Sequence, residues 1–202
     1  MSSVLVGRDV VKRVEAGAHT SPLVVGCRIP HSYFVTQGRG ESDITIHAGS
    51  YHLALRSAGI EMCNIITYSS ILPGIAQETE RPTDGTLVHG SVMETIMADA
   101  TATRGERATA GLVTGWLYDR ETGGRYGGFV CEYHGDKSAG EVALELGESI
   151  HELYENGYSE RYLLRDISTR VESFVPVKQY GTAIVAICFT DYVVPVLSQE
   201  TF

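Results

Sequence analysis

Two segments of the sequence carry side chains whose types and positions could do chemistry. The first is Asn-Ile-Ile-Thr-Tyr-Ser-Ser-Ile-Leu-Pro, residues 64–73, in which a predicted strand runs into two adjacent hydroxyls, Ser69 and Ser70. A serine hydroxyl becomes a nucleophile when a base accepts its proton and a carbonyl is held against it. Paired serines before a Pro73-Gly74 turn also end many ordinary strands, so this segment by itself does not identify a reaction.

The second segment is Gly-Gly-Phe-Val-Cys-Glu-Tyr, residues 127–133, a predicted strand with a single carboxylate. Alternation along a strand puts Glu132 on the same face as Val130, while the residues on either side of Glu132 face the other way. A carboxylate on a largely apolar strand lies either at the rim of a sheet or in a site whose surroundings raise the pKa of the carboxyl.

Other familiar catalytic signatures are missing from the sequence. It has no Gly-x-x-x-x-Gly-Lys-Ser/Thr loop, no Gly-x-Ser-x-Gly elbow and no His-Glu-x-x-His. His47 and His52 are five residues apart, which puts them on different sides of a helix and argues against a shared metal ion. The cysteines form no Cys-x-x-Cys pair, so we expect no metal site and four buried, reduced thiols. They are Cys27, Cys63, Cys131 and Cys188.

The composition is that of an ordinary soluble globular protein. Of 202 residues, 43% are hydrophobic and 20% charged, and the formal net charge is −9. A net-acidic chain without a run of Lys or Arg argues against nucleic acid or an anionic membrane as partner. The longest strongly apolar stretch, Thr182 to Phe189, is too short to span a bilayer, and the first residues do not read as a secretory signal. We therefore expect a cytosolic, or cytoplasmic, protein.

The pattern of the first half predicts one helix and short strands. Apolar residues at three- and four-residue spacing from Ala48 to Ala58 predict a helix that ends at Gly59. Four further segments are assigned from composition and pattern. They are an amphipathic lead-in over residues 1–20, a strand over 23–27, a glycine-marked loop over 37–40 and a strand over 64–68.

The second half predicts a β meander, a helix and two more strands. Ser138 and Glu141 form a capping box that opens an amphipathic helix, which Asn156-Gly157 ends. The segment 182–189 is apolar almost throughout, as expected of a central strand covered on both faces. The strands of the meander are predicted over 87–97, 108–117 and 126–133, with a polar turn over 119–124, and a further strand over 166–175.

Because strands outnumber helices and each amphipathic helix must cover a sheet, we expect an α+β fold. The predicted architecture is an αββα sandwich of two mainly antiparallel sheets with outer helices. No linker or repeat divides the chain, so residues 1–202 are predicted to form a single domain.

Together, residues 64–73 and 127–133 resemble the pyruvoyl-dependent arginine decarboxylases, and the likeness extends over roughly residues 48–189. Its most specific part is the asparagine five residues before Ser-Ser-Ile-Leu-Pro, supported by the Glu-Tyr on a later strand. The resemblance implies a proenzyme that cuts itself between Ser69 and Ser70. Residues 1–69 would become the β chain and residues 70–202 the α chain.

In such a family the Ser70 hydroxyl attacks the Ser69 carbonyl and turns the peptide into an ester. β-Elimination then releases the β chain, and hydration with loss of ammonia leaves a pyruvoyl group at residue 70. The resemblance implies that this covalent group accepts electrons as carbon dioxide leaves, in place of pyridoxal phosphate (PLP) and without a metal. The expected reaction converts arginine to agmatine.

The resemblance also implies roles for other residues. Glu132 would transfer a proton, and Asn64 would lie beside the cleavage site, where its amide bonds the reacting carbonyl. His52 and Ile71 would contact the substrate, a small-molecule amino acid. The expected assembly is a homotrimer with active sites between subunits.

One residue departs from the family pattern. Counting back from Asn64 without a gap, His52 stands where the family has an aspartate that holds the guanidinium of arginine, and Arg56 follows one turn later. A histidine is a poor partner for a guanidinium. Two explanations stay open: the chain acts on another amino acid such as aspartate or glutamate, or a different carboxylate supplies the charge. The candidates for that carboxylate are Glu41, Asp43 and Glu61.

A binding homologue that never cuts itself is the alternative from outside the enzymes. The presence of Ser69-Ser70, Asn64 and Glu132 together argues against it, because a non-processing copy has no use for these particular residues.

Overall fold

The structure, a computed structural model, describes residues 23–83 and 85–199. Near the two ends of the chain, β1 (Leu23–Val25) pairs antiparallel with β13 (Val196–Gln199). Residues Ile29–Val193 form a separate compact unit, which contains both main sheets. The amphipathic lead-in expected over 1–20 lies outside the described residues, and the single-domain prediction stays a prediction.

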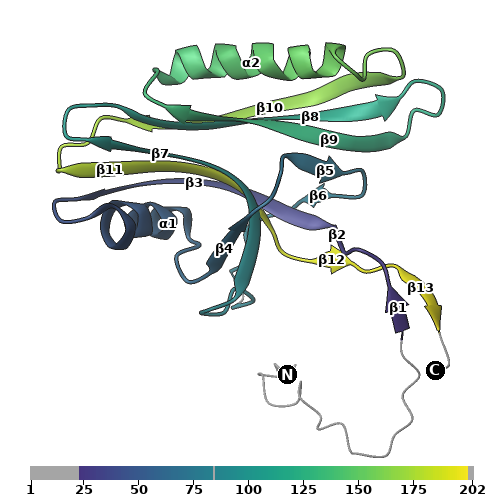
Figure 1. The fold of residues 1–202 in the computed structure, drawn as a ribbon, viewed down its shortest axis with the longest axis horizontal. Helices are drawn as coiled ribbons and strands as arrows, with labels where there is room; N and C mark the ends of the chain where they lie inside the picture. Colours follow the sequence, from purple (N-terminus) through teal and green to yellow (C-terminus); the bar gives the residue numbers. More distant parts are fainter. Residues whose placement is uncertain (1–22, 84, 200–202) are drawn as a thin grey trace, which may run out of the picture. The chain divides into compact units, whose positions relative to one another are not determined.

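Most strands of the compact unit belong to two sheets (Figure 1). The larger sheet has the strand order β4-β7-β11-β3-β6, with β4 and β6 parallel to their neighbours and the other pairs antiparallel. Its strands are β3 (Ser32–Ser42), β4 (Asn64–Thr67), β6 (Gln77–Glu78), β7 (Val92–Thr103) and β11 (Tyr180–Phe189). The smaller sheet, β10-β8-β9-β5, is antiparallel throughout. It contains β5 (Ile71–Pro73), β8 (Ala108–Asp119), β9 (Arg125–Gly135) and β10 (Tyr162–Phe174). A short ladder joins β2 (Ile29–Pro30) to β12 (Tyr192–Val193).

One helix covers the outer face of each sheet (Figure 1). A π-helical turn, η1 (Ile46–Tyr51), leads into α1 (His52–Ala58), which packs on the larger sheet and ends at Gly59 with a φ of 74°. The longer α2 (Ala139–Glu155) packs on the smaller sheet and begins with the expected capping box between Ser138 and Glu141. The predicted αββα sandwich of mainly antiparallel sheets is therefore confirmed.

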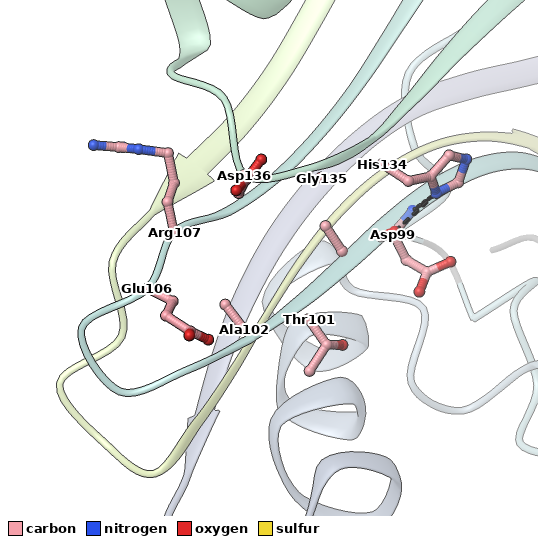
Figure 2. A pocket seen from close by; sticks show the side chains of 9 residues that line it. Asp99, Thr101, Ala102, Glu106, Arg107, His134, Gly135 and Asp136 are labelled. Carbon is pink, nitrogen blue, oxygen red and sulfur yellow. Dashed lines mark hydrogen bonds between the residues drawn. The ribbon is translucent and has the colours of Figure 1, made fainter.

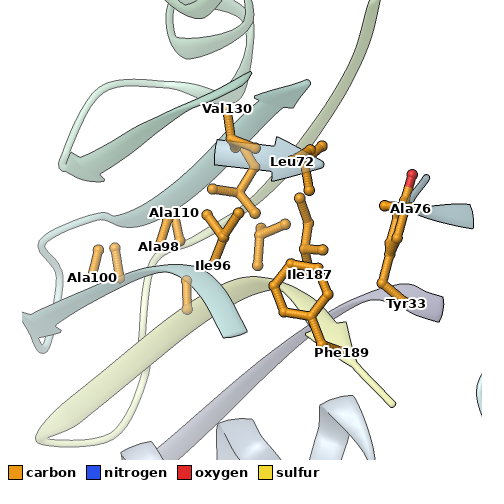
Figure 3. Packing of buried hydrophobic residues seen from close by; sticks show 14 of the residues in the cluster. Tyr33, Leu72, Ala76, Ile96, Ala98, Ala100, Ala110, Val130, Ile187 and Phe189 are labelled. Atoms are coloured by element: carbon orange, nitrogen blue, oxygen red, sulfur yellow. The ribbon is translucent and has the colours of Figure 1, made fainter. Parts of the chain in front are cut away.

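The space between the sheets is filled by a cluster of apolar side chains that range from alanines to the rings of Tyr33 and Phe189 (Figure 3). Alternate residues of β11 face this cluster, among them Val185 and Ile187, while Ile184 and Ala186 face α1. This division explains why β11 is apolar at almost every position, since it is the central strand of the larger sheet and both of its faces are buried.

The middle of the chain is not the three-stranded meander expected from its pattern. Strands β8 and β9 pair as a hairpin, but β7 belongs to the other sheet and faces β8 across the core. The alanines of β7 and β8, such as Ala98 and Ala110, allow this face-to-face contact. Strand β7 also begins later than expected, at Val92, because residues 87–91 form a turn.

The glycine-marked segment 37–40 was predicted to be a loop, and this was wrong. It lies within β3, and both Gly38 and Gly40 are buried beneath α1. A Cβ atom at Gly40 would overlap the backbone of Ser50 and Ala54. These glycines therefore let the helix lie directly on the strand. In a sequence, glycines with this role look the same as glycines that mark a turn.

The cysteines differ from one another in burial. Cys63 and Cys188 are buried as expected, but Cys131 is half-buried and Cys27 is exposed, so the expectation of four buried thiols was wrong. Separately, no helix among the described residues is long and apolar enough to cross a membrane. The expected cytosolic location stays a prediction.

The contact between β3 and α1 can be tested with Gly40→Ala. The added methyl group must displace helix backbone, so we expect the free energy of unfolding to fall by about 1–3 kcal/mol or more. Gly147→Ala is the matched control, because a Cβ there meets nothing within 4 Å. In the middle of α2 it should raise stability by about 0.5–1 kcal/mol. Urea unfolding of both variants measures these changes, and equal stability of Gly40→Ala and the parent protein would contradict the packing described.

Candidate active site at the crossing between the sheets

The chain passes from one sheet to the other at residues 68–70. Strand β4 ends at Thr67 in the larger sheet, and β5 begins at Ile71 in the smaller one (Figure 1). The Tyr68 N–H donates to the Thr95 carbonyl of β7 at 2.7 Å, and the Val130 N–H of β9 donates to the Ser70 carbonyl at 3.0 Å. Each end of the crossing is thus bonded to a different sheet, and Ser69 lies between them.

The Ser69 carbonyl accepts a hydrogen bond within the crossing itself. The Ile71 N–H lies 2.8 Å from this oxygen, which closes a tight turn around Ser70. A donor aimed at a carbonyl oxygen stabilises the negative charge that develops there when a nucleophile attacks the carbon. The carbonyl preceding Ser70 is therefore polarised by its own backbone.

The Ser70 hydroxyl donates a hydrogen bond to Oε1 of Glu132. Glu132 lies opposite Leu112 in the β8–β9 ladder, and Leu112 and Val130 both face the space between the sheets. The predicted alternation is confirmed, since Glu132 shares the inner face with Val130. A half-buried carboxylate that already accepts the hydroxyl hydrogen is placed to take that proton from Ser70.

The neighbouring thiol is not a competing nucleophile. Burial, and then the adjacent Glu132 carboxylate, raise the pKa of the Cys131 thiol above its ordinary value. The thiol therefore stays protonated at neutral pH, and Cys131 faces α2 rather than the inner space. Among residues 23–83 and 85–199, no group of three His, Cys, Asp or Glu side chains is arranged to hold a metal ion.

Two predicted site residues lie away from Ser70 within this chain. Asn64 is at the opposite end of β4, where its Nδ2 donates to the Gly90 carbonyl at 3.0 Å. His52 begins α1, on the outer face of the larger sheet, whereas Glu132 faces the inner side. The described part of the chain contains no hydrogen bond from Asn64 or His52 to either serine.

Ile71 follows the crossing, and its side chain points away from Glu132. It pairs with Phe129, on the face of the smaller sheet that α2 covers, and is 63% exposed. Together with Tyr126 and Tyr158 it lines a groove of about 370 Å³.

Beyond the crossing, both sheets present open edges. Strand β4 covers β7 only from Val92 to Thr95, and β5 covers β9 only from Gly127 to Phe129. Further along, His134 of β9 reaches across to β7, where its Nδ1 lies 2.8 Å from the Asp99 carbonyl oxygen. Open edges offer unpaired backbone groups to another chain.

A cavity of about 630 Å³ opens at these edges. Figure 2 shows the side chains that line it. Its lining includes three carboxylates, one guanidinium and the His134 imidazole, which lies two residues beyond Glu132 on the same strand. The charged residues are Asp99, Glu106, Arg107 and Asp136.

Two of the three carboxylates considered for binding a cation are already engaged. Glu41 accepts the backbone N–H groups of Val177 and Lys178. Asp43 accepts the backbone N–H of Gln179 at 3.1 Å and the Arg104 guanidinium at 3.4 Å. Both therefore secure the turn that precedes β11, which leaves Glu61 as the candidate without such a structural commitment.

Comparison with known proteins gives a consistent result. A family model described as pyruvoyl-dependent arginine decarboxylase matches residues 32–194. A protein named pyruvoyl-dependent arginine decarboxylase AaxB, from Chlamydia trachomatis serovar L2, is 38% identical over 119 residues, which are 54% of this chain and 60% of that protein. A pyruvoyl-dependent arginine decarboxylase from Methanopyrus kandleri is 36% identical over 72 residues, or 36% of this chain and 45% of that protein. The aligned region thus spans at most about 60% of the length of these two relatives.

Proposed function

Because the chain belongs to the pyruvoyl-dependent arginine decarboxylase family, we propose that it is a self-processing decarboxylase of an amino acid, with arginine as the first candidate substrate. One observation carries the proposal. The Ser70 hydroxyl donates a hydrogen bond to the Glu132 carboxylate, and the adjoining Ser69 carbonyl accepts one from the Ile71 N–H. A nucleophile with a proton acceptor thus adjoins a polarised carbonyl.

The proposed cut begins when Glu132 takes the hydroxyl proton and the Ser70 oxygen attacks the Ser69 carbonyl carbon. The Ile71 N–H stabilises the resulting oxyanion, the bond to the Ser70 nitrogen breaks, and that nitrogen takes a proton, which leaves an ester and a free amine. Loss of the Cα proton of residue 70 then breaks its Cβ–Oγ bond and releases the Ser69 carboxylate. Water replaces the nitrogen of the dehydroalanine left at position 70, and ammonia departs.

The residues present fit a pyruvoyl group at position 70. That position immediately precedes β5, its carbonyl is held by the Val130 N–H, and the Glu132 carboxylate is already within hydrogen-bonding reach of its side chain. The group supplies an electron sink for the bond that breaks when carbon dioxide leaves. Glu132 on the inner face then holds the proton that the substrate α-carbon must receive.

The same proposal includes a homotrimer with active sites between subunits. Asn64 and His52 are away from Ser70 within one chain, so a neighbouring copy is needed to bring them to it. The open edges of β7 and β9, which lie beside the crossing, offer a surface on which such a copy can pair.

Ser70→Ala tests the nucleophile directly. Removal of the hydroxyl should abolish both chain cleavage and decarboxylation, because no oxygen is left to attack the Ser69 carbonyl. Ser69→Ala is the matched control, since it keeps that carbonyl and should still yield two chains. Denaturing gels and release of labelled carbon dioxide measure the two effects. Cleavage of Ser70→Ala at the same bond would show that another group cuts the chain.

Glu132→Gln tests the proton-transfer role of Glu132 without changing the fold. The amide is nearly the same size, so far-ultraviolet circular dichroism should not change. Turnover by the processed fraction should fall by a factor of about 10²–10⁴, because the amide neither accepts nor returns a proton. Turnover within twofold of the parent protein would remove Glu132 from the proton-transfer role.

An acidic amino acid is the second candidate substrate, and α1 carries the observation that favours it. His52 and Arg56 are one helical turn apart and exposed. Neither side chain makes a hydrogen bond or ion pair with another described residue. Glu41 and Asp43 are engaged elsewhere, so Glu61 is the one carboxylate of the three considered that is left to bind a cation, whereas the free side chains of His52 and Arg56 suit a substrate carboxylate.

To distinguish the two candidate substrates, kcat/KM for arginine, aspartate and glutamate is measured in the parent protein and in the variants His52→Asp and His52→Asn. If residue 52 contacts the substrate side chain, His52→Asp should raise the preference for arginine over the acidic substrates at least about tenfold. His52→Asn should not, because it adds no charge. A parent protein that strongly prefers arginine would exclude the second candidate, and equal preferences in all three proteins would remove residue 52 from substrate binding.

A further inference from the structure

Cutting the chain after residue 69 creates a new chain end at the residue that must react. Chain ends are mobile unless they are held, and the inference that follows rests on the proposed cleavage. In the uncut chain, residue 70 is held from both sides: the chain leads back to Tyr68, at the end of β4, which bonds Thr95 of β7, and the residue 70 carbonyl bonds Val130 of β9. After the cut, only the α-chain side remains, and that side begins with a three-residue edge strand, β5.

We infer that Arg125 is a positioning residue that holds the segment 70–76 on β9 after the cut, and thereby keeps residue 70 aligned with Glu132. Nε of Arg125 donates to the Gly74 carbonyl at 2.8 Å, and its terminal nitrogen donates to the Ala76 carbonyl at 2.5 Å. The two acceptors belong to the turn that follows β5, in which the Ala76 N–H also bonds the Pro73 carbonyl at 2.9 Å. The planar guanidinium thus fastens both ends of one turn.

The Arg125 side chain is itself held in place. Its guanidinium carbon lies 4.2 Å from the centre of the Trp116 ring, and Trp116 is only 7% exposed. A cation over an aromatic face gains electrostatic attraction, and the ring also restricts the rotamers of the arginine. The turn is therefore tied to β8 through a side chain with little freedom of its own.

Arg125 also begins the strand that carries Glu132. Strand β9 thus carries three groups that place residue 70. Arg125, which bonds the turn after β5, is at one end of the strand, the Val130 N–H that bonds residue 70 is in the middle, and the Glu132 carboxylate is two residues further along. The position of residue 70 relative to Glu132 is set along this one strand. A shift of about 1 Å between reacting groups can lower a rate about 100-fold.

This arrangement predicts different effects on the two reactions. During the cut, β4 still restrains residue 70, so loss of Arg125 should change the rate of cleavage by less than about threefold. During turnover, β4 no longer helps, so misalignment should lower kcat by a factor of about 10–100. KM should change by less than about threefold, because Arg125 bonds only the protein backbone in this structure.

Arg125→Met and Arg125→Lys test the inference. Methionine keeps much of the packing on Trp116 but has no hydrogen-bond donor. Lysine keeps the positive charge, but its single ammonium group cannot bond the Gly74 and Ala76 carbonyls together as the guanidinium does. Arg120→Met is the matched control. Two nitrogens of the Arg120 guanidinium also donate to a backbone carbonyl, that of Ser159, at a turn away from Ser69 and Ser70. Cleavage is followed on denaturing gels, and kcat and KM are measured on the processed fraction of each protein.

The expected order of kcat is parent protein, then Arg125→Lys, then Arg125→Met, with cleavage nearly unchanged and Arg120→Met like the parent. Arg125→Met with the kcat of the parent would overturn the inference. So would an equal loss of kcat in Arg120→Met, which would indicate general destabilisation. If Arg125→Met fails to fold, Arg125→Lys decides, and a kcat equal to that of the parent overturns the inference. A parent protein that is never cut would overturn the proposed function and this inference with it, whereas a cut parent with unaffected variants would overturn the inference alone.

Discussion

The candidate site depends on a constraint of the backbone, the short crossing from the larger sheet to the smaller one. Four peptide links join Thr67 to Ile71 and can span about 14 Å when extended, little more than the roughly 10 Å that separates packed sheets. Hydrogen bonds from the backbone of Tyr68 and Ser70 to different sheets fix both ends. Between them, Ser69 has no ladder partner, and its carbonyl is left to bond the Ile71 N–H.

The sandwich supplies what the crossing lacks. Alanines on the inner faces of β7 and β8 bring the sheets together, and the alternation of β9 turns Glu132 into the same inner space. The carboxylate therefore meets the Ser70 hydroxyl because β9, distant in sequence, both carries Glu132 and bonds the Ser70 carbonyl, rather than through a local motif. Chemistry and architecture are coupled here, since a shift of residue 70 along β9 would move the nucleophile away from the base.

Much of this arrangement follows from the sequence, and the exceptions have physical causes. The capping box at Ser138, the end of α1 at Gly59 and the face of Glu132 depend on local geometry, which residue types specify well. The glycines under α1 and the placement of β7 opposite β8 depend on packing between segments far apart in the chain, which the periodicity of apolar residues does not report. At the site, sequence patterns named the serines and Glu132. They gave no sign of the donors from Ile71 and Val130, because every residue type except proline carries a backbone N–H.

The intact mass of the purified protein under denaturing conditions tests the central claim most directly. The account predicts two chains divided between residues 69 and 70. It also predicts that the larger chain is lighter than a serine-ended fragment by one ammonia and reacts with a carbonyl reagent at its new end. A single chain with the full mass of 202 residues after long incubation would contradict the account. The bonds to Ser69 and Ser70 would then describe a strand crossing without chemistry.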